Sequence, residues 1–167
     1  MSSGKLVDYD IAEKIARRWV MHIAMLPKTE KVAIVGSLRR KKKQVRDIDL
    51  QVIGNNYDIQ DLFWQKGIEL DSGGDRRQIY TLKSGIKMNI FFCYPHAWGT
   101  ALMHNTGPSR YNIRKRMQVK RQGYKLNQYG VFDNDGSMVD ELTTKWDEEK
   151  KVYDYFGWTY CMPEDRE

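Results

Sequence analysis

The segment Asp47-Ile48-Asp49, at the start of an apolar run, constrains the fold more than any other part of the sequence. Residues two positions apart on a β-strand point to the same face, so both carboxylates can contact one hard divalent cation. The residues between and after them are apolar, as expected for a strand over 47–53 whose other face is buried. The segment therefore predicts a half-buried sheet that carries a cation-binding site.

A second apolar segment lies just upstream and ends in a glycine-serine pair. The strand predicted over 31–36 ends at Gly36, and Ser37 follows directly. A turn of this kind offers backbone N–H groups and a hydroxyl to phosphate oxygens. Each feature alone is common in proteins without such a site. Together they favour the transfer of a nucleotide from a metal-bound triphosphate.

Positive charge is unevenly distributed along the chain. The net charge is +6, but residues 1–132 carry 24 Lys and Arg against 11 Asp and Glu, whereas residues 133–167 carry 4 against 11. One basic cluster lies at 39–46, beside the predicted cation site. A second basic stretch contains Arg110, Arg114, Lys115, Arg116, Lys120, Arg121 and Lys125. This density of charge favours a nucleic-acid partner over a merely solvated surface.

Length and cysteine content narrow the class of protein further. A chain of 167 residues fits one domain or two small subdomains that share a core. Cys93 and Cys161 are far apart, which indicates neither a disulfide framework nor a zinc site and fits a reducing compartment. No apolar run is long enough to cross a bilayer. We therefore expect a cytoplasmic protein without a membrane partner, and a monomer.

The pattern of apolar residues and breakers predicts an α+β fold with a mixed sheet. The elements expected in the first part are a helix over 8–26, strands over 31–36 and 47–53, a helix over 57–66, and strands over 68–71, 78–83 and 86–93. Ser84-Gly85 is expected to join the last two strands as a hairpin. The elements expected in the second part are helices over 95–104, 108–122 and 146–156, with a turn at 134–136.

The basic helix predicted over 108–122 has two charged faces. At 100° per residue, Arg110, Arg114 and Arg121 share one side, whereas Arg116 and Lys120 point elsewhere. One face is suited to a phosphate backbone, and the other is expected to reach inward.

Several ordered motifs, taken together, resemble DNA polymerase family X. The first is Gly36-Ser37-Leu38-Arg39-Arg40 followed by the carboxylate pair, which resembles the palm motif of that family. The others are Thr106-Gly107-Pro108, Tyr111-Asn112, Arg116, the run 123–130, and the segments 148–158 and 163–166. Motifs in this order at compatible spacing are far more specific than any one of them.

The resemblance implies a nucleotidyltransferase palm over 1–94 and a nucleotide- and template-binding subdomain over 95–167. The implied activity is that of a repair-type DNA-dependent DNA polymerase, which adds a deoxynucleotide to a primer 3′-hydroxyl by two-metal nucleotidyl transfer. Its implied partners are primed or gapped DNA and a deoxynucleoside triphosphate, with Mg²⁺ as cofactor and Mn²⁺ as a substitute. About thirty residues precede the first palm strand, too few for the amino-terminal lyase domain of larger members. The layout is similar to a minimal viral form of the family, so we expect a viral or phage protein that acts in the host cell.

Residue by residue, the resemblance implies a catalytic and metal-binding set, a nucleotide-binding set and a DNA-binding set. The first set is Asp47, Asp49 and Asn89. The nucleotide-binding set is Gly36, Ser37, Arg40, His104, Asn105, Gly107 and Asn112. The DNA-binding set is Lys87 near the primer terminus, Arg116 near the template, and Arg110, Arg114, Lys120 and Arg121.

Asn89 is the sharpest departure from the family pattern, which has a third Asp at this position. An amide can offer a carbonyl oxygen to a metal, but it cannot take a proton and supplies less negative charge. The residue is either natural or engineered, and it predicts weak or absent activity. Two alternatives therefore stay open: a catalytically silent DNA- or nucleotide-binding protein, and a template-independent nucleotidyltransferase. The basic helix over 108–122 argues against a small-molecule acceptor.

Overall fold

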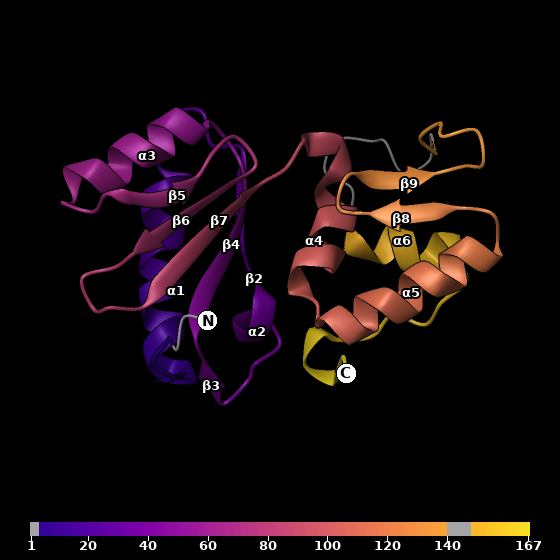
Figure 1. Cartoon of the computed structure of the whole chain (residues 1–167), viewed down its shortest axis with the longest axis horizontal. Helices are drawn as coiled ribbons and strands as arrows, with labels where there is room; N and C mark the ends of the chain where they lie inside the picture. The colour runs from indigo at the N-terminus through magenta and orange to yellow at the C-terminus, as the bar shows by residue number, and fades with distance from the viewer. Residues whose placement is uncertain (1–3, 140–147) are drawn as a thin grey trace. The chain divides into compact units, whose positions relative to one another are not determined.

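The computed structural model describes residues 4–139 and 148–167. It consists of two compact units, unit 1 over Met1–Phe92 and unit 2 over Cys93–Glu167, each with its own hydrophobic core (Figure 1). Both helices and a mixed sheet are present, so the predicted α+β class is confirmed. Within the described ranges, no helix is long and apolar enough to span a lipid bilayer.

Unit 1 is built on a five-stranded sheet in the order β2-β4-β7-β6-β5. The strands are β2 (Lys31–Val35), β4 (Asp47–Ile53), β5 (Leu70–Gly73), β6 (Arg77–Thr81) and β7 (Lys87–Phe92). Strands β4 and β7 are parallel, and every other pair of neighbours is antiparallel. The sheet therefore places residues of β4 directly beside residues of β7, about forty positions later in the sequence.

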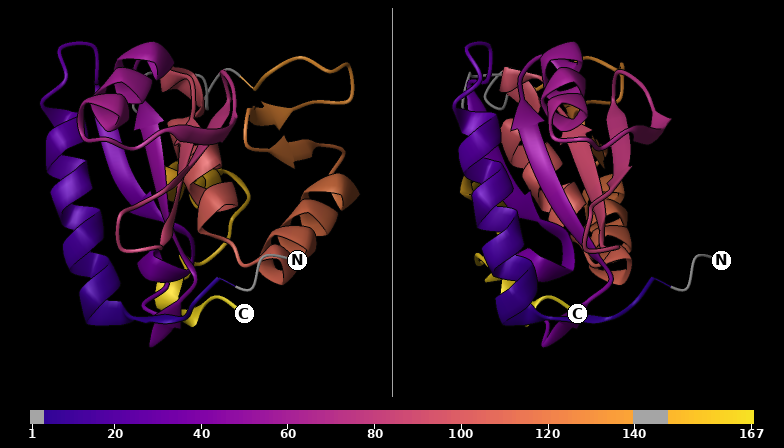
Figure 2. Two further views of the ribbon diagram at one scale, coloured as in Figure 1. Left: turned by 60° about the vertical axis from the view of Figure 1, so that its left-hand side comes forward. Right: turned by 90° about the vertical axis from the view of Figure 1, so that its left-hand side faces the viewer.

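Two helices cover one face of this sheet, as Figure 2 shows. They are α1 (Tyr9–Ala24) and α3 (Asn56–Gln65). The ring of Trp19 in α1 stacks on Phe63 in α3 with 4.1 Å between centroids, and Phe63 stacks on Tyr80 of β6 at 3.7 Å. This stack joins both helices to the same side of the sheet.

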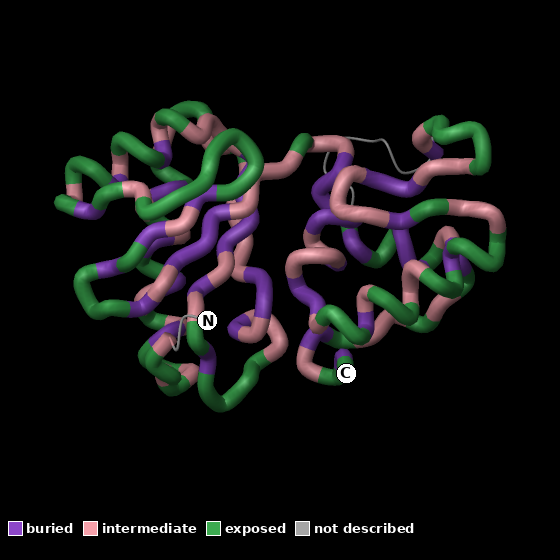
Figure 3. The backbone as a smooth tube through the Cα atoms, viewed as in Figure 1, coloured by how far each residue is buried: buried purple, intermediate pink, exposed green. Residues whose placement is uncertain are grey.

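Burial alternates along the first part of β4 and sets the direction of its carboxylates. Ile48, Leu50 and Val52 are fully buried in the core under the helices (Figure 3). Asp47 and Asp49 alternate with them and therefore point to the opposite face of the sheet. The helices cover the apolar face and leave the carboxylate face for other contacts.

Two expected elements of unit 1 differ from the structure. The strand expected over 68–71 begins only at Leu70, because the N–H of Ile68 bonds the carbonyl of Phe63 and closes the end of α3. The turn expected at Gly36-Ser37 is a single helical turn, α2 (Gly36–Arg39), in which Arg40 N–H bonds the carbonyl of Gly36. A short pair of strands, β1 (Val7–Asp8) and β3 (Gln44–Val45), was not predicted.

Unit 2 contains three α-helices among its described residues, together with a short hairpin. Its elements are η1 (Pro95–Ala97), α4 (Trp98–Thr106), α5 (Ser109–Arg121), β8 (Lys125–Asn127), β9 (Gly130–Phe132), α6 (Glu149–Tyr155) and η3 (Pro163–Asp165). The helices expected over 95–104 and 108–122 are confirmed in their main parts. Of the helix expected over 146–156, the first two residues lie outside the described residues.

The hairpin of β8 and β9 was not predicted from the sequence. Each strand has only three residues, too few to show the alternation that marks a longer strand. The side-chain oxygen of Asn127 accepts the N–H of Tyr129 at 2.8 Å and closes the turn between them. The turn expected at 134–136 is confirmed, since Gly136 N–H bonds the carbonyl of Asp133.

Candidate active site

The parallel pairing of β4 and β7 brings the three predicted catalytic residues together. In this register Asp47 lies opposite Lys87, and Asp49 lies opposite Asn89. The Nδ2 atom of Asn89 donates to Oδ1 of Asp49 at 2.7 Å and lies 3.4 Å from Oδ2 of Asp47. Two segments that are forty residues apart in the sequence therefore form one polar cluster on the face of the sheet opposite α1 and α3.

Arg77, a residue that sequence reasoning missed, completes this cluster. Its Nη2 atom donates to Oδ1 of Asn89 at 3.0 Å, and its guanidinium lies over the Phe91 ring at 5.2 Å. Because β6 and β7 are antiparallel with Ile79 opposite Asn89, residue 77 is a diagonal neighbour of Asn89 on the same face. The turn at Ser84-Gly85 sets the register of β6 against β7, and that register is the sequence feature from which this contact could have been predicted.

The electrostatics of the cluster leave Asp49 without full compensation. Loss of solvent raises the pKa of the Asp49 carboxyl above its usual value, and the Asp47 charge raises it further. The hydrogen bond from Asn89 and the charges of Arg77 and Arg40 oppose this shift but do not cancel it. A carboxylate in this state is stabilised by a nearby cation.

Gly36 is required at the end of β2 by its close approach to this carboxylate. Strand β2 pairs with β4 so that Val35 lies opposite Asp49, and Gly36 follows with a φ of 66°. A Cβ atom at position 36 would lie 2.1 Å from Oδ2 of Asp49. Glycine is therefore needed both for its backbone conformation and for space. It places the start of α2 beside Asp49, and Arg40, directly after α2, is close enough for its charge to act on that carboxylate.

The donor set of the cluster fits a divalent cation. Asp47 and Asp49 are hard oxygen donors on one face, and loss of solvent raises the pKa of the Asp49 carboxyl, an effect that a bound cation would oppose. Among the described residues, no group of three or more His, Cys, Asp or Glu side chains is arranged to hold a metal ion. The site offers two carboxylates and one amide, and the two carboxylates suit a hard divalent cation.

Two residues of the predicted nucleotide-binding set, His104 and Asn112, line a small cavity between α4, α5 and β8, whereas Asn105 and Gly107 of the same set do not. The cavity volume is about 10 Å³, and its lining residues are Thr100, Met103, His104, Asn112, Arg116, Leu126 and Asn127. Such a space holds about one water molecule. The side chain of Asn112 donates through Nδ2 to the carbonyl of His104 at 2.8 Å. Its Oδ1 atom is buried without a hydrogen-bond partner among the described residues, so it can accept a donor from a ligand.

His104 and Arg116 form a close pair at the same cavity. Nη2 of Arg116 lies 2.6 Å from Nδ1 of His104, and because a guanidinium only donates, the imidazole nitrogen accepts. Burial lowers the pKa of the His104 imidazole, and the charge of Arg116 lowers it further. Arg116 thus points to α4, as expected for the inward-facing side of the basic helix, whereas Lys120, expected on the same side, is exposed. Asn105 and Gly107 follow His104 at the end of α4, where Gly107 has a φ of 63°.

Lys115 of α5 is half-buried against the Trp158 ring. Four other basic residues of α5 are exposed, which suits contact with a large anion. They are Arg110, Arg114, Lys120 and Arg121. Arg114 also donates to the backbone carbonyl of Glu167 and lies over the Tyr111 ring. Lys87, at the start of β7 in unit 1, is half-buried.

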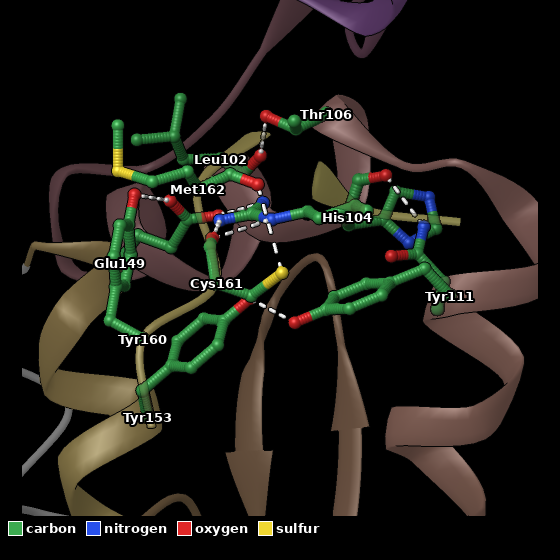
Figure 4. Close-up of polar contacts among 11 residues, drawn as sticks. Leu102, His104, Thr106, Tyr111, Glu149, Tyr153, Tyr160, Cys161 and Met162 are labelled. Carbon is green, nitrogen blue, oxygen red and sulfur yellow. Dashed lines mark hydrogen bonds and ion pairs between the residues drawn. The ribbon is translucent and has the colours of Figure 1, made fainter. Parts of the chain in front are cut away.

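A buried ion pair anchors the C-terminal segment of unit 2, and sequence reasoning did not predict it. Arg166 is 1% exposed and donates through Nη1 to Oε1 of Glu149 at 2.5 Å. It also donates to the carbonyl of Cys161, and Tyr160 donates to the other oxygen of Glu149 (Figure 4). The Tyr111 and Tyr153 hydroxyls bond each other at 2.5 Å beside this pair. All of these contacts link elements within unit 2, so the cluster is structural.

Comparison of the sequence with known proteins identifies relatives of this chain. The family model for the DNA polymerase beta thumb matches residues 101–167. The Repair DNA polymerase X of African swine fever virus (isolate Warthog/Namibia/Wart80/1980) is 28% identical over 176 residues, covering 98% of this chain and 96% of that protein.

Two further relatives extend the comparison. The protein of the same name from African swine fever virus (strain Badajoz 1971 Vero-adapted) is 31% identical over 147 residues, covering 83% of this chain and 82% of that protein. The DNA polymerase/3'-5' exonuclease PolX of Bacillus subtilis (strain 168) is 27% identical over 164 residues, which cover 93% of this chain but 28% of that protein. These matches confirm the resemblance inferred from the motifs: the chain belongs to DNA polymerase family X.

Proposed function

We propose that this chain is a repair DNA polymerase that adds a deoxynucleotide to the 3′-hydroxyl of a primer on a DNA template. The primer 3′-oxygen bonds the α-phosphorus of the triphosphate, the bond from that phosphorus to the bridging oxygen breaks, and pyrophosphate leaves. The proton of the hydroxyl passes to solvent. Relatives named as repair DNA polymerases support this class of reaction. The observation that carries the proposal is the alternation of burial along β4, by which the carboxylates of Asp47 and Asp49 share one face of the sheet.

The cofactors that we propose are two Mg²⁺ ions, with Mn²⁺ as a substitute. When bound, they supply positive charge that lowers the pKa of the primer hydroxyl and stabilises the leaving pyrophosphate. Asp47 and Asp49 would hold them, because both offer hard oxygen atoms on the face of the sheet opposite α1 and α3. Asn89 would be a ligand only through its Oδ1 atom.

The start of α2 is suited to the triphosphate of the incoming nucleotide. Gly36 brings the backbone N–H groups of this turn close to Asp49, and Ser37 adds a hydroxyl. Arg40 supplies a guanidinium, which makes charge-assisted hydrogen bonds to phosphate oxygens. These residues bind and orient the phosphates and require no change of their own protonation.

Unit 2 is proposed to recognise the rest of the nucleotide and the DNA. Asn112 offers its buried acceptor Oδ1 to a donor on the base, while His104, Asn105 and Gly107 lie at the adjoining end of α4. Arg116 is proposed to contact the template. The residues proposed to neutralise DNA phosphates are Arg110, Arg114, Lys120 and Arg121, with Lys87 near the primer terminus.

One observation favours a second candidate, a catalytically silent protein that binds DNA and nucleotide. The amide nitrogen of Asn89 donates to Asp49, so in this structure the third position contributes a hydrogen-bond donor where a metal site needs oxygen. A protein of this kind would keep the basic surface of α5 and the α2 turn but would not extend a primer.

Primer extension on a single-nucleotide gapped duplex separates these candidates. The assay compares the chain as it stands with Asn89→Asp and Asp49→Ala, each with Mg²⁺ and with Mn²⁺. We expect slow extension that Mn²⁺ improves, and a gain of about 10²- to 10⁴-fold for Asn89→Asp, the range of general acid–base contributions. Asp49→Ala should be inactive, and all three should bind the gapped duplex alike in fluorescence anisotropy. If Asn89→Asp gains nothing and the unmodified chain is inert with both metals while binding is intact, the silent protein is the correct function.

A further inference from the structure

We propose that Arg77 is a positioning residue that holds the Asn89 amide with its nitrogen toward the carboxylates, and thereby limits the free protein to one tightly bound divalent cation. This inference rests on the proposed function only for the identity of the cation. The contacts that carry it are the bond from Arg77 Nη2 to Asn89 Oδ1 at 3.0 Å and the bond from Asn89 Nδ2 to Asp49 at 2.7 Å.

The chemistry of the partners determines which way the amide points. A guanidinium has only donors and an ionised carboxylate has only acceptors, so the oxygen of Asn89 must face Arg77 and its nitrogen must face Asp49. Half a turn of the amide would set the NH₂ group against Nη2 and the oxygen against two carboxylates. Both hydrogen bonds would be lost and replaced by repulsion, and Asn89 is only 4% exposed, so water could hardly compensate.

Arg77 is placed well for this role. Its backbone is held on both sides, since Arg77 pairs with Phe91 of β7 and its carbonyl accepts the N–H of Gly74, just after β5, at 2.8 Å. Its guanidinium also lies over the Phe91 ring at 5.2 Å. These backbone hydrogen bonds fix the start of the side chain, and the contact with the Phe91 ring stabilises the position of the guanidinium. Residue 77 as a whole is exposed. A substitution there can remove the guanidinium without opening the core.

The consequence concerns the number of oxygen ligands available to cations. With its nitrogen inward, Asn89 cannot coordinate, so the ligands from this cluster are the carboxylates of Asp47 and Asp49 alone. The amide hydrogen bond also occupies Oδ1 of Asp49, one of the oxygen atoms that a cation would need. Loss of the guanidinium frees the amide to turn its oxygen toward the carboxylates and complete a second set of ligands.

The test is a Mn²⁺ titration of the full chain without DNA or nucleotide, followed by electron paramagnetic resonance of free Mn²⁺. It compares the unmodified chain with Arg77→Met and Arg77→Lys, and repeats Arg77→Met in an Asn89→Ala background. We expect one tight Mn²⁺ in the unmodified chain and in Arg77→Lys, which keeps a donor and the charge. Arg77→Met should bind Mn²⁺ about tenfold more tightly or gain a second ion, a coupling typical of directly contacting residues.

The Asn89→Ala background separates orientation of the amide from simple loss of positive charge. Without an amide to turn, Arg77→Met should change Mn²⁺ affinity only by the general effect of charge, about two- to threefold at an exposed position. An equal gain in both backgrounds would overturn the proposal, and so would two Mn²⁺ ions of similar affinity in the unmodified chain.

A second readout follows the amide itself. The side-chain NH₂ signal of Asn89 in a ¹H–¹⁵N correlation spectrum is identified by its absence in Asn89→Ala. On addition of Mg²⁺, this signal should keep its hydrogen-bonded position in the unmodified chain and move in Arg77→Met. Movement to the same extent in both would contradict the proposal. Neither measurement involves nucleotide transfer, so an inactive polymerase would leave this inference standing, and its failure would leave the proposed function standing.

Discussion

Each unit contains a cluster of charged side chains, and the two clusters differ in how far their charges are compensated. In unit 2, Glu149 and Arg166 are almost completely buried and fully engaged, with the ion pair at 2.5 Å and further bonds to Tyr160 and to the carbonyl of Cys161. In unit 1, Asp47 and Asp49 share one face, and Asp49 keeps a raised pKa despite its bond from Asn89. Charge is therefore balanced within the protein in one cluster and left unbalanced in the other.

This difference separates a structural cluster from a functional one. A buried pair that is broken leaves an uncompensated charge and destabilises the fold. A desolvated carboxylate beside another carboxylate already costs stability and is relieved by an external cation. Substitutions that neutralise one carboxylate should therefore affect stability in unit 2 and activity in unit 1.

The largest expected effect is on the activity of Asp49→Asn. This change removes the charge that would hold a cation, so primer extension should fall by about 10³-fold or more. The free energy of unfolding should stay equal or rise, because a desolvated charge next to Asp47 is removed. Single-turnover extension and urea unfolding of the same preparation measure both quantities. A clear loss of stability would mean that Asp49 is structural, like Glu149.

The next effect is the loss of stability in Glu149→Gln. This nearly isosteric change leaves Arg166 buried with its charge uncompensated and should destabilise unit 2 by about 3–5 kcal/mol in urea unfolding. Glu13→Gln is a matched control, because Glu13 pairs with Arg17 on the exposed side of α1 and should contribute little. Equal, small losses in the two variants would remove the contrast between the clusters.

A smaller effect is expected for Arg121→Ala at the exposed end of α5. If Arg121 neutralises one DNA phosphate, the slope of log affinity against log salt should decrease in magnitude by about 1. Arg17→Ala serves as the control, because Arg17 lies on α1 and is not among the predicted DNA-binding residues. Fluorescence anisotropy of a gapped duplex between low and moderate salt gives the slopes for the unmodified chain and the two variants. Identical slopes for all three proteins would exclude Arg121 from the interface.

The smallest expected effect is a change in the pH dependence of stability, and it involves His104. The folded pKa of His104 lies below its usual value of 6.5, so the unfolded chain takes up a proton first as the pH falls. The contribution of His104 to the free energy of unfolding is fully present above pH 6.5. It is lost as the pH falls from there through the lower pKa of the folded state. His104→Gln should remove this part of the pH dependence. Urea unfolding between pH 5 and pH 8 is the measurement, and an unchanged profile in the variant would contradict the assignment.

The sequence predicted the elements that depend on local pattern. The alternation around Asp47 and Asp49 predicted a strand with one buried face, and the apolar spacing over 8–26 predicted the helix that covers it. Local sequence was insufficient for β8 and β9, whose three-residue strands carry no clear period. Several ordered motifs between Gly36 and Arg166 together identified the family, because each motif is formed by residues close together in the chain.

Tertiary structure alone decided which residues meet across strands and helices. The contact of Arg77 with Asn89 depends on the register of β6 against β7, and the pairing of Asp49 with Asn89 depends on a parallel neighbour forty residues away. Likewise, Glu149 and Arg166 appear in the sequence as two ordinary charges, and only the packing of the C-terminal segment buries them together. The physical reason is that local propensity acts over a few residues, whereas desolvation and hydrogen-bond partners are set by whatever the completed fold brings alongside.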